Sequence, residues 1–173
     1  MDAAHLHLMF NHLPIVGTPL VAGLLLWGLV QRSREVLRAA LGAAVIVAGL
    51  SYPVFLTGEP AEETVEDSSW LQERLVHEHE ERAETGLIAI LLTGTLGAGV
   101  LWQSRAGRNV PRATAGLTLA GLLLSSALFG WAALAGGRIR HDELRNGEAA
   151  VRTAADSTTT VRQGGRSDGD RDN

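Results

Sequence analysis

The sequence predicts an all-α membrane protein, an up-and-down bundle of four transmembrane helices with an acidic, histidine-bearing cap on one face. Three observations lead to this prediction. Four long stretches contain no charged residue. A long polar stretch, residues 58–84, separates the second of them from the third. The other two connections are short and rich in arginine.

Each charge-free stretch is long enough to cross a bilayer as a helix. The hydrocarbon core is about 30 Å thick and an α-helix rises about 1.5 Å per residue, so roughly 20 apolar residues suffice. The stretches are apolar all round, whereas helices of a soluble bundle carry a polar stripe. We therefore expect transmembrane helices at about residues 13–30, 39–58, 85–104 and 113–137.

These helices are expected to form one domain, residues 1–145, since 173 residues leave no room for a second globular domain of ordinary size. Residues 146–173 contain few large apolar side chains and many Thr, Asp, Gly and Arg, which predicts a disordered polar tail. No basic residue precedes the first apolar run and no small-residue cleavage site follows it, so we expect a retained helix.

The composition excludes several kinds of chemistry. The chain has no cysteine, which excludes disulfides, thiolate metal sites and a cysteine nucleophile. No Ser-His-Asp arrangement, phosphate-binding glycine loop or nucleic-acid patch stands out. The expected partners are therefore membrane lipid and a membrane or envelope protein, with no nucleic acid. The apolar runs carry no charged residue, so no ion path through the membrane is expected.

Positive charge near helix ends orients a membrane protein. Residues 31–38 and 103–112 each carry three arginines, and no basic residue precedes the first helix. Arginines also follow the fourth helix and lie in the acidic stretch, so a raw count nearly ties. Because short turns and the first helix carry most weight, we expect both termini and the acidic stretch outside, and the arginine turns inside.

Glycines are expected to mark the interior of the bundle. Lipid tails are as apolar as leucine, so helices in a bilayer associate through close contact of small residues. Prolines near the acidic face predict kinked or irregular helices there: Pro14, Pro19 and Pro53. The glycines that recur at packing intervals are Gly42, Gly49, Gly94, Gly97, Gly116, Gly121 and Gly130.

Helical spacing indicates which histidines point inward. The third helix, continued backwards, places His79 on a stripe of mostly small residues: Ala83, Gly86, Ile90, Thr93 and Gly97. His77 lies on a different stripe, with Glu81, Glu84, Ile88 and Leu91. His141 follows a comparable stripe of the fourth helix: Ala127, Gly130, Leu134 and Gly137. His12 faces inward, and His7 elsewhere, if the first helix extends back to residue 5. We therefore expect His12, His79 and His141 to converge above the bundle axis.

Converging imidazoles and carboxylates suit a divalent transition ion. Neutral imidazole nitrogen favours zinc, copper, iron or nickel, and carboxylate oxygens complete the shell. Closely spaced glutamates repel each other, and a dication relieves that repulsion. The expected metal ligands are His7, His12, Glu59, Glu62, His79, Glu84 and His141.

Haem b held by two histidines from different helices is a second possible cofactor. Arg138 and Arg140 would then pair with the propionates. The surrounding negative charge disfavours propionates, and histidines at helix ends leave little wall to cover the ring. A zinc, copper or iron ion therefore ranks above haem b.

The leading hypothesis is thus a metal-binding redox or accessory component of the cell envelope, and two alternatives stay open. Histidines and acids also occur on a solvated cap at a membrane interface, where acids stabilise a helix N-terminus. The protein would then be a cofactor-free structural or assembly subunit whose acidic loop docks a partner. A metalloenzyme would require an open coordination position and a substrate pocket.

Four short motifs stand out at the predicted cap: NHLPI at residues 11–15, TGEPAE at 57–62, HEERAE at 79–84 and GGRIRH at 136–141. They resemble motifs of a group of small bacterial four-helix integral membrane proteins. The resemblance extends from residue 1 to about residue 145. It implies the four-helix architecture and a bacterial cytoplasmic (inner) membrane, and it brings no reaction or ligand set with it.

Overall fold

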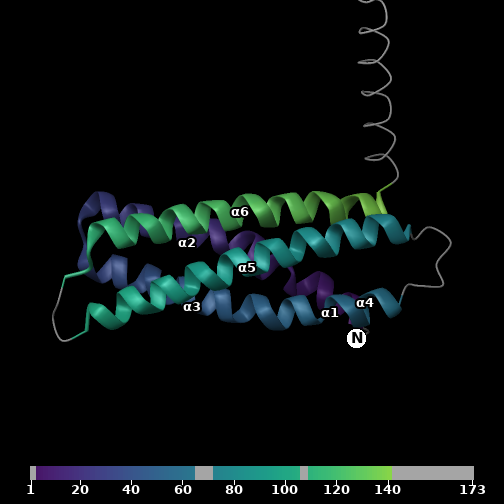
Figure 1. The fold of residues 1–173 in the computed structure, drawn as a ribbon, viewed down its shortest axis with the longest axis horizontal. Helices are drawn as coiled ribbons and strands as arrows, with labels where there is room; N and C mark the ends of the chain where they lie inside the picture. The colour runs from purple at the N-terminus through teal and green to yellow at the C-terminus, as the bar shows by residue number, and fades with distance from the viewer. Residues whose placement is uncertain (1–2, 65–71, 106–108, 142–173) are drawn as a thin grey trace, which may run out of the picture.

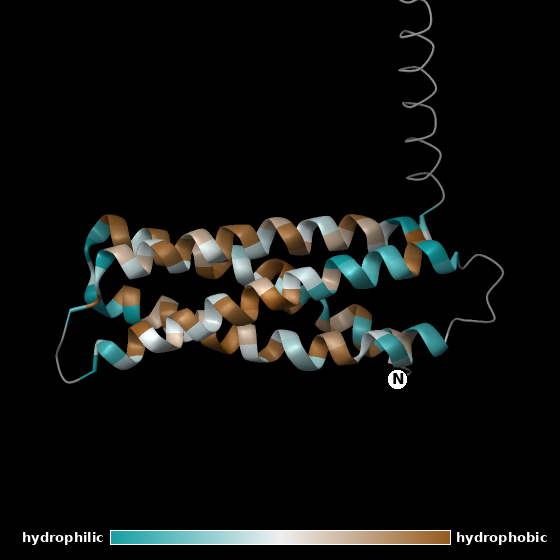
Figure 2. Ribbon diagram, viewed as in Figure 1, coloured by the Kyte–Doolittle hydropathy of each residue, from teal (hydrophilic) through white to brown (hydrophobic). Residues whose placement is uncertain are grey.

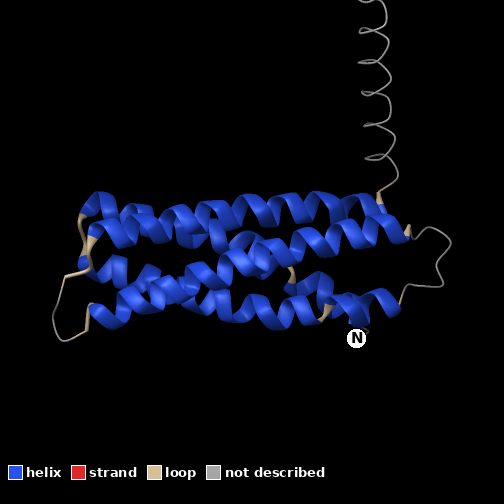
Figure 3. Ribbon diagram, viewed as in Figure 1, coloured by secondary structure: helices blue, strands red, loops and turns tan. Residues whose placement is uncertain are grey.

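The computed structural model describes residues 3–64, 72–105 and 109–141, and the elements in these ranges are all helices (Figure 1). Figure 3 shows helices and loops but no strand in the described ranges. The predicted tail, residues 146–173, lies outside them. The helices are α1 (Ala3–Phe10), α2 (His12–Gln31), α3 (Arg34–Leu56), α4 (Gly58–Glu63), α5 (Glu73–Gln103) and α6 (Arg112–Arg140).

Four helical spans are long and apolar enough to cross a membrane: Ala3–Gln31, Arg34–Glu63, Glu73–Gln103 and Arg112–Ile139. Apolar residues cover the middle of the bundle, and polar residues gather toward its ends (Figure 2). Large apolar side chains on the outside are exposed, among them Leu20 and Leu92, each at 68%. Such exposure is expected where lipid replaces water as the solvent. The chain is therefore a multi-pass membrane protein, as the charge-free runs predict.

The four long helices pack around a shared core. α2 packs against α3 and α6, and α5 packs against the same two helices, so α2 and α5 lie diagonally opposite (Figure 1). Leu25, Leu41, Ile90 and Leu122, one from each long helix, are completely buried between them. The two short helices, α1 and α4, pack against each other at one end of the bundle.

The first span is interrupted at Asn11, which separates α1 from α2. Pro14 lies in the first turn of α2, where a missing backbone N–H costs no helical hydrogen bond. Pro19 and Pro53 lie inside α2 and α3. The interruption falls close to the first of the three prolines, and it lets α1 contact α4.

The third span begins well before its charge-free run. α5 starts at Glu73, so part of the polar stretch 58–84 is helical. Side chains four residues apart face each other on a helix and can pair. The pairs in this segment are Arg74 with Glu78, His77 with Glu81 and Glu78 with Arg82.

Some of the expected glycines lie at helix contacts and others do not. A Cβ atom on Gly94 of α5 would lie 2.4 Å from the Cβ atom of Ala48 on α3. A Cβ atom on Gly121 of α6 would lie 2.5 Å from Thr93 Oγ1 on α5. Glycine is therefore what allows these backbones to approach each other. Four predicted interior glycines have nothing within 4 Å of such an atom, contrary to the prediction: Gly42, Gly49, Gly116 and Gly130.

Candidate functional site

Two histidines from different helices lie at the end of the bundle that contains α1 and α4. His7 belongs to α1 and His79 to α5, and both side chains are half-buried. The two imidazoles interact electrostatically. We call His7 and His79 the histidine pair.

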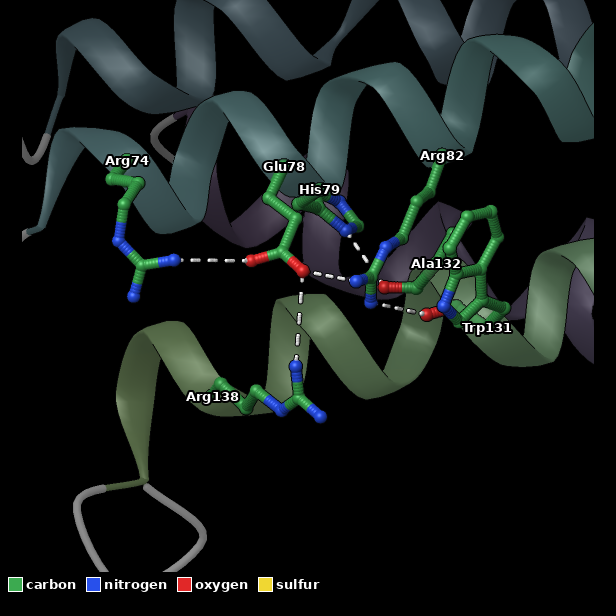
Figure 4. A network of polar contacts seen from close by, with 7 residues as sticks. All are labelled: Arg74, Glu78, His79, Arg82, Trp131, Ala132 and Arg138. Atoms are coloured by element: carbon green, nitrogen blue, oxygen red, sulfur yellow. Dashed lines mark hydrogen bonds and ion pairs between the residues drawn. The ribbon is translucent and has the colours of Figure 1, made fainter. Parts of the chain in front are cut away.

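Hydrogen bonds determine which ring nitrogen of each histidine carries the proton. His79 Nδ1 lies 2.9 Å from the carbonyl oxygen of Ala132 on α6, and a carbonyl only accepts, so Nδ1–H donates (Figure 4). His7 Nδ1 lies 2.9 Å from Thr57 Oγ1. The Thr57 hydroxyl donates to the Val54 carbonyl at 2.6 Å, so it accepts from His7. In the neutral state both rings therefore carry their lone pair on Nε2.

The local sequence makes room for these rings. A Cβ atom on Gly136 would lie 3.1 Å from His79 Cε1, so glycine at this position allows the ring to lie against α6. Thr57, which orients His7, caps the C-terminus of α3 and precedes α4. Thr57, His79 and Gly136 belong to three of the four motifs singled out in the sequence.

The other predicted ligands are exposed, with the exception of Glu62. His12 is exposed, and its Nδ1 donates to a backbone carbonyl one turn earlier. His141 is exposed at the C-cap of α6. Glu59 and Glu84 are exposed, and Glu62 is half-buried. Within the described ranges, no three His, Asp or Glu side chains are arranged to hold a metal ion.

His12 and His141 therefore do not point into the bundle with His79 as expected, since both are exposed. The His12 expectation required a helix continuous back to residue 5, and the interruption at Asn11 breaks that continuity. The His141 expectation used a stripe through Gly130 and Leu134. Leu134 is 64% exposed, so that stripe faces away from the core.

A charged network that the sequence analysis did not identify lies between α5 and α6 (Figure 4). The Glu78 carboxylate pairs with Arg82, with Arg74 at 3.7 Å and with Arg138 at 3.9 Å. Arg82 also donates to the Trp131 carbonyl at 3.4 Å and lies over the Trp131 ring, 4.3 Å from its centroid. The spacing of Arg74, Glu78 and Arg82 at four-residue intervals was the available signal.

The two arginines expected near haem propionates have different surroundings. Arg138 takes part in the network around Glu78. Arg140 is the last residue of α6, and its side chain lies outside the described part of the chain.

Replacing Arg82 by Met is expected to lower the free energy of unfolding by about 1–3 kcal/mol, because it removes a charged partner from the half-buried Glu78. Arg74→Met is the matched control. Its side chain is 79% exposed, and exposed ion pairs contribute at most about 1 kcal/mol. Thermal unfolding in one detergent compares the two variants. Equal losses would contradict a larger contribution from Arg82, the more buried of these two partners of Glu78.

Comparisons of this chain with protein-family models, curated proteins and solved structures find no match. The resemblance of its four motifs to those of small bacterial four-helix membrane proteins therefore stays a prediction.

Proposed function

We propose that this multi-pass membrane protein binds a metal cofactor through Nε2 of His7 and Nε2 of His79. One observation carries the proposal. Two imidazoles from separate helices lie at the same end of the bundle, and each donates its Nδ1–H to an oxygen atom. Histidines that bind metals typically donate their second ring N–H to a carbonyl or carboxylate in this way, because the hydrogen bond fixes the tautomer and orients the ring.

The leading cofactor is a transition metal ion: zinc, copper or iron. Neutral imidazole nitrogen is a good ligand for each of these ions. Two protein ligands leave coordination positions for water or for a donor from a partner. If the ion is copper or iron, such a site would suit a redox or accessory component of the cell envelope. Close packing of His79 against Gly136 favours a compact ion.

Haem b is the second candidate cofactor, and it is favoured because the site offers only two protein ligands. The porphyrin supplies four equatorial nitrogens, so the protein has to provide only two axial histidines from different helices. Arg138 lies two residues after Gly136 on α6, so it is at the same end of the bundle as His79 and could pair with a propionate. Haem would require α5 and α6 to move apart beside His79, and this requirement ranks it below an ion.

The proposal includes an orientation. The four long helices would run up and down across a bacterial cytoplasmic membrane. The histidine pair and the acidic residues would form a cap on the outside, and the short arginine turns would lie inside, as the positive-inside rule favours.

Elemental analysis and absorption spectra of the detergent-purified protein, oxidised and dithionite-reduced, test this proposal. A colourless protein with close to one zinc, copper or iron per chain supports the ion site. A Soret band that sharpens on reduction supports haem b.

Absence of both metal and pigment, even after incubation with zinc, copper and haem, would contradict the proposal. It would favour a cofactor-free subunit that docks a basic partner. Exposed acids at this end of the bundle are available for such docking: Glu59, Glu63, Glu73, Glu81 and Glu84.

A further inference from the structure

A second polar site lies at the opposite end of the bundle. Residues from the turn between α2 and α3, together with residues 109–112, line a pocket of about 380 Å³ there. Its position is independent of the histidine pair. The residues that line it are Arg32, Arg34, Leu37, Asn109, Val110 and Arg112.

Positive charge dominates this end of the bundle. The described residues of the two connections and the adjoining helix ends carry five arginines and one acid, Glu35. Glu35 accepts a hydrogen bond from Ser33, at the N-cap of α3. Two of the five arginines do not line the pocket: Arg38 donates to the Ser104 carbonyl, and Arg105 lies over the Trp102 ring.

The pocket joins this charge to an apolar surface. Leu37 and Val110 line it and are themselves buried, at 6% and 7% exposure. On the outside of the same end, Trp102 and Val30 are each 67% exposed. Exposed tryptophan beside arginine is typical of the depth at which lipid headgroups meet acyl chains.

We propose that this pocket binds the headgroup phosphate of an anionic phospholipid. Guanidinium groups bind phosphate oxygens through paired N–H donors, and basic pockets between membrane helices are suited to anionic headgroups. Asn109 supplies a further polar side chain for the headgroup. The acyl chains would extend along the exposed apolar side chains of this end. A free phosphate shares the headgroup chemistry but would gain nothing from that apolar surface.

Native mass spectrometry of the full chain in a mild detergent, with added phosphatidylglycerol or phosphatidylcholine of the same acyl composition, tests the proposal. We expect the wild-type protein to retain phosphatidylglycerol more strongly. The double variant Arg34→Gln/Arg112→Gln should weaken this binding on the order of 30-fold, since each arginine near a headgroup contributes roughly fivefold.

The double variant Arg38→Gln/Arg105→Gln is the matched control. It removes the same charge from the same end without changing the pocket lining, so phosphatidylglycerol binding should stay within about threefold of the wild type. Equal losses in the two double variants would overturn the pocket in favour of general surface charge.

Two wild-type measurements test the proposal without any variant. Equal retention of phosphatidylglycerol and phosphatidylcholine would overturn it. Displacement of the lipid by millimolar inorganic phosphate would also overturn it, because it would show that the site takes a free phosphate.

Discussion

His79→Ala is expected to abolish high-affinity metal binding, whereas His77→Ala is expected to leave it intact. His79 supplies one of the two Nε2 donors, and its ring is held by Ala132. His77 is 74% exposed and pairs with Glu81 on the outer face of α5. Loss of an outer-shell partner alone weakens metal sites by about 10–100-fold, so loss of a direct ligand should cost more than about 100-fold.

Isothermal titration of zinc into metal-free protein in detergent measures this difference. His7→Ala should match His79→Ala, because a two-histidine site depends equally on both rings. Thermal unfolding of each variant shows whether it remains folded. If His77→Ala weakens zinc binding as much as His79→Ala, the metal binds to the acidic surface in general and the histidine pair is not its site.

Gly94→Ala is expected to have the largest effect on stability. The new methyl group would lie 2.4 Å from Ala48 Cβ, so α3 and α5 would have to separate. Overpacking of this kind costs about 1–3 kcal/mol. Thermal unfolding in a single detergent should show a lower midpoint for the variant.

Gly99→Ala is the matched control on the same helix. A methyl group at Gly99 meets nothing within 4 Å, and alanine favours a helix over glycine by about 1 kcal/mol. We therefore expect unchanged or slightly higher stability. Equal midpoints for the Gly94 and Gly99 variants would contradict the close contact of α3 with α5.

The membrane helices could be predicted from the sequence because charge-free runs of this length rarely occur outside membrane spans. The residues at which the helices begin and end could not be predicted. α5 starts at Glu73 because pairs four residues apart support a helix within the polar stretch, beyond the apolar run. The break at Asn11 could not be predicted either. α1 and α2 together form one span of apolar residues, and the length of that span does not indicate where the helix is interrupted.

The helical spacing of residues correctly predicted which face of α5 is buried. The stripe predicted to face inward with His79 includes Gly86, Ile90, Thr93 and Gly97, and all four are buried. Ile88, on the stripe of His77, is 52% exposed. Every turn of that helix contributes to one packed face, so the phase is well determined.

The same reasoning predicted the wrong buried face for α6. Glycine was taken as a mark of the interior, but Gly116 and Gly130 have open space beside them. The buried face runs through Leu122, Phe129 and Ala132 instead. Small residues permit close packing without requiring it, so a glycine stripe alone cannot orient a helix whose other faces are also apolar.

Helical phase did not single out His7, although His7 and His79 were both among the expected metal ligands. The position of His7 depends on the packing of α1 against α4, a contact between segments that share no periodicity in the sequence. Thr57 then orients the His7 ring across that contact. Tertiary packing of two short helices thus decides where His7 lies.

X-ray absorption spectroscopy of the zinc-loaded protein tests the histidine pair most directly, because it counts imidazole ligands around the metal. Binding by His7 and His79 predicts two imidazole nitrogens at about 2.0–2.1 Å from zinc, and one in His7→Ala protein loaded at saturating zinc. A spectrum with only oxygen ligands, or an imidazole count unchanged in the His7→Ala variant, would contradict the two-histidine site.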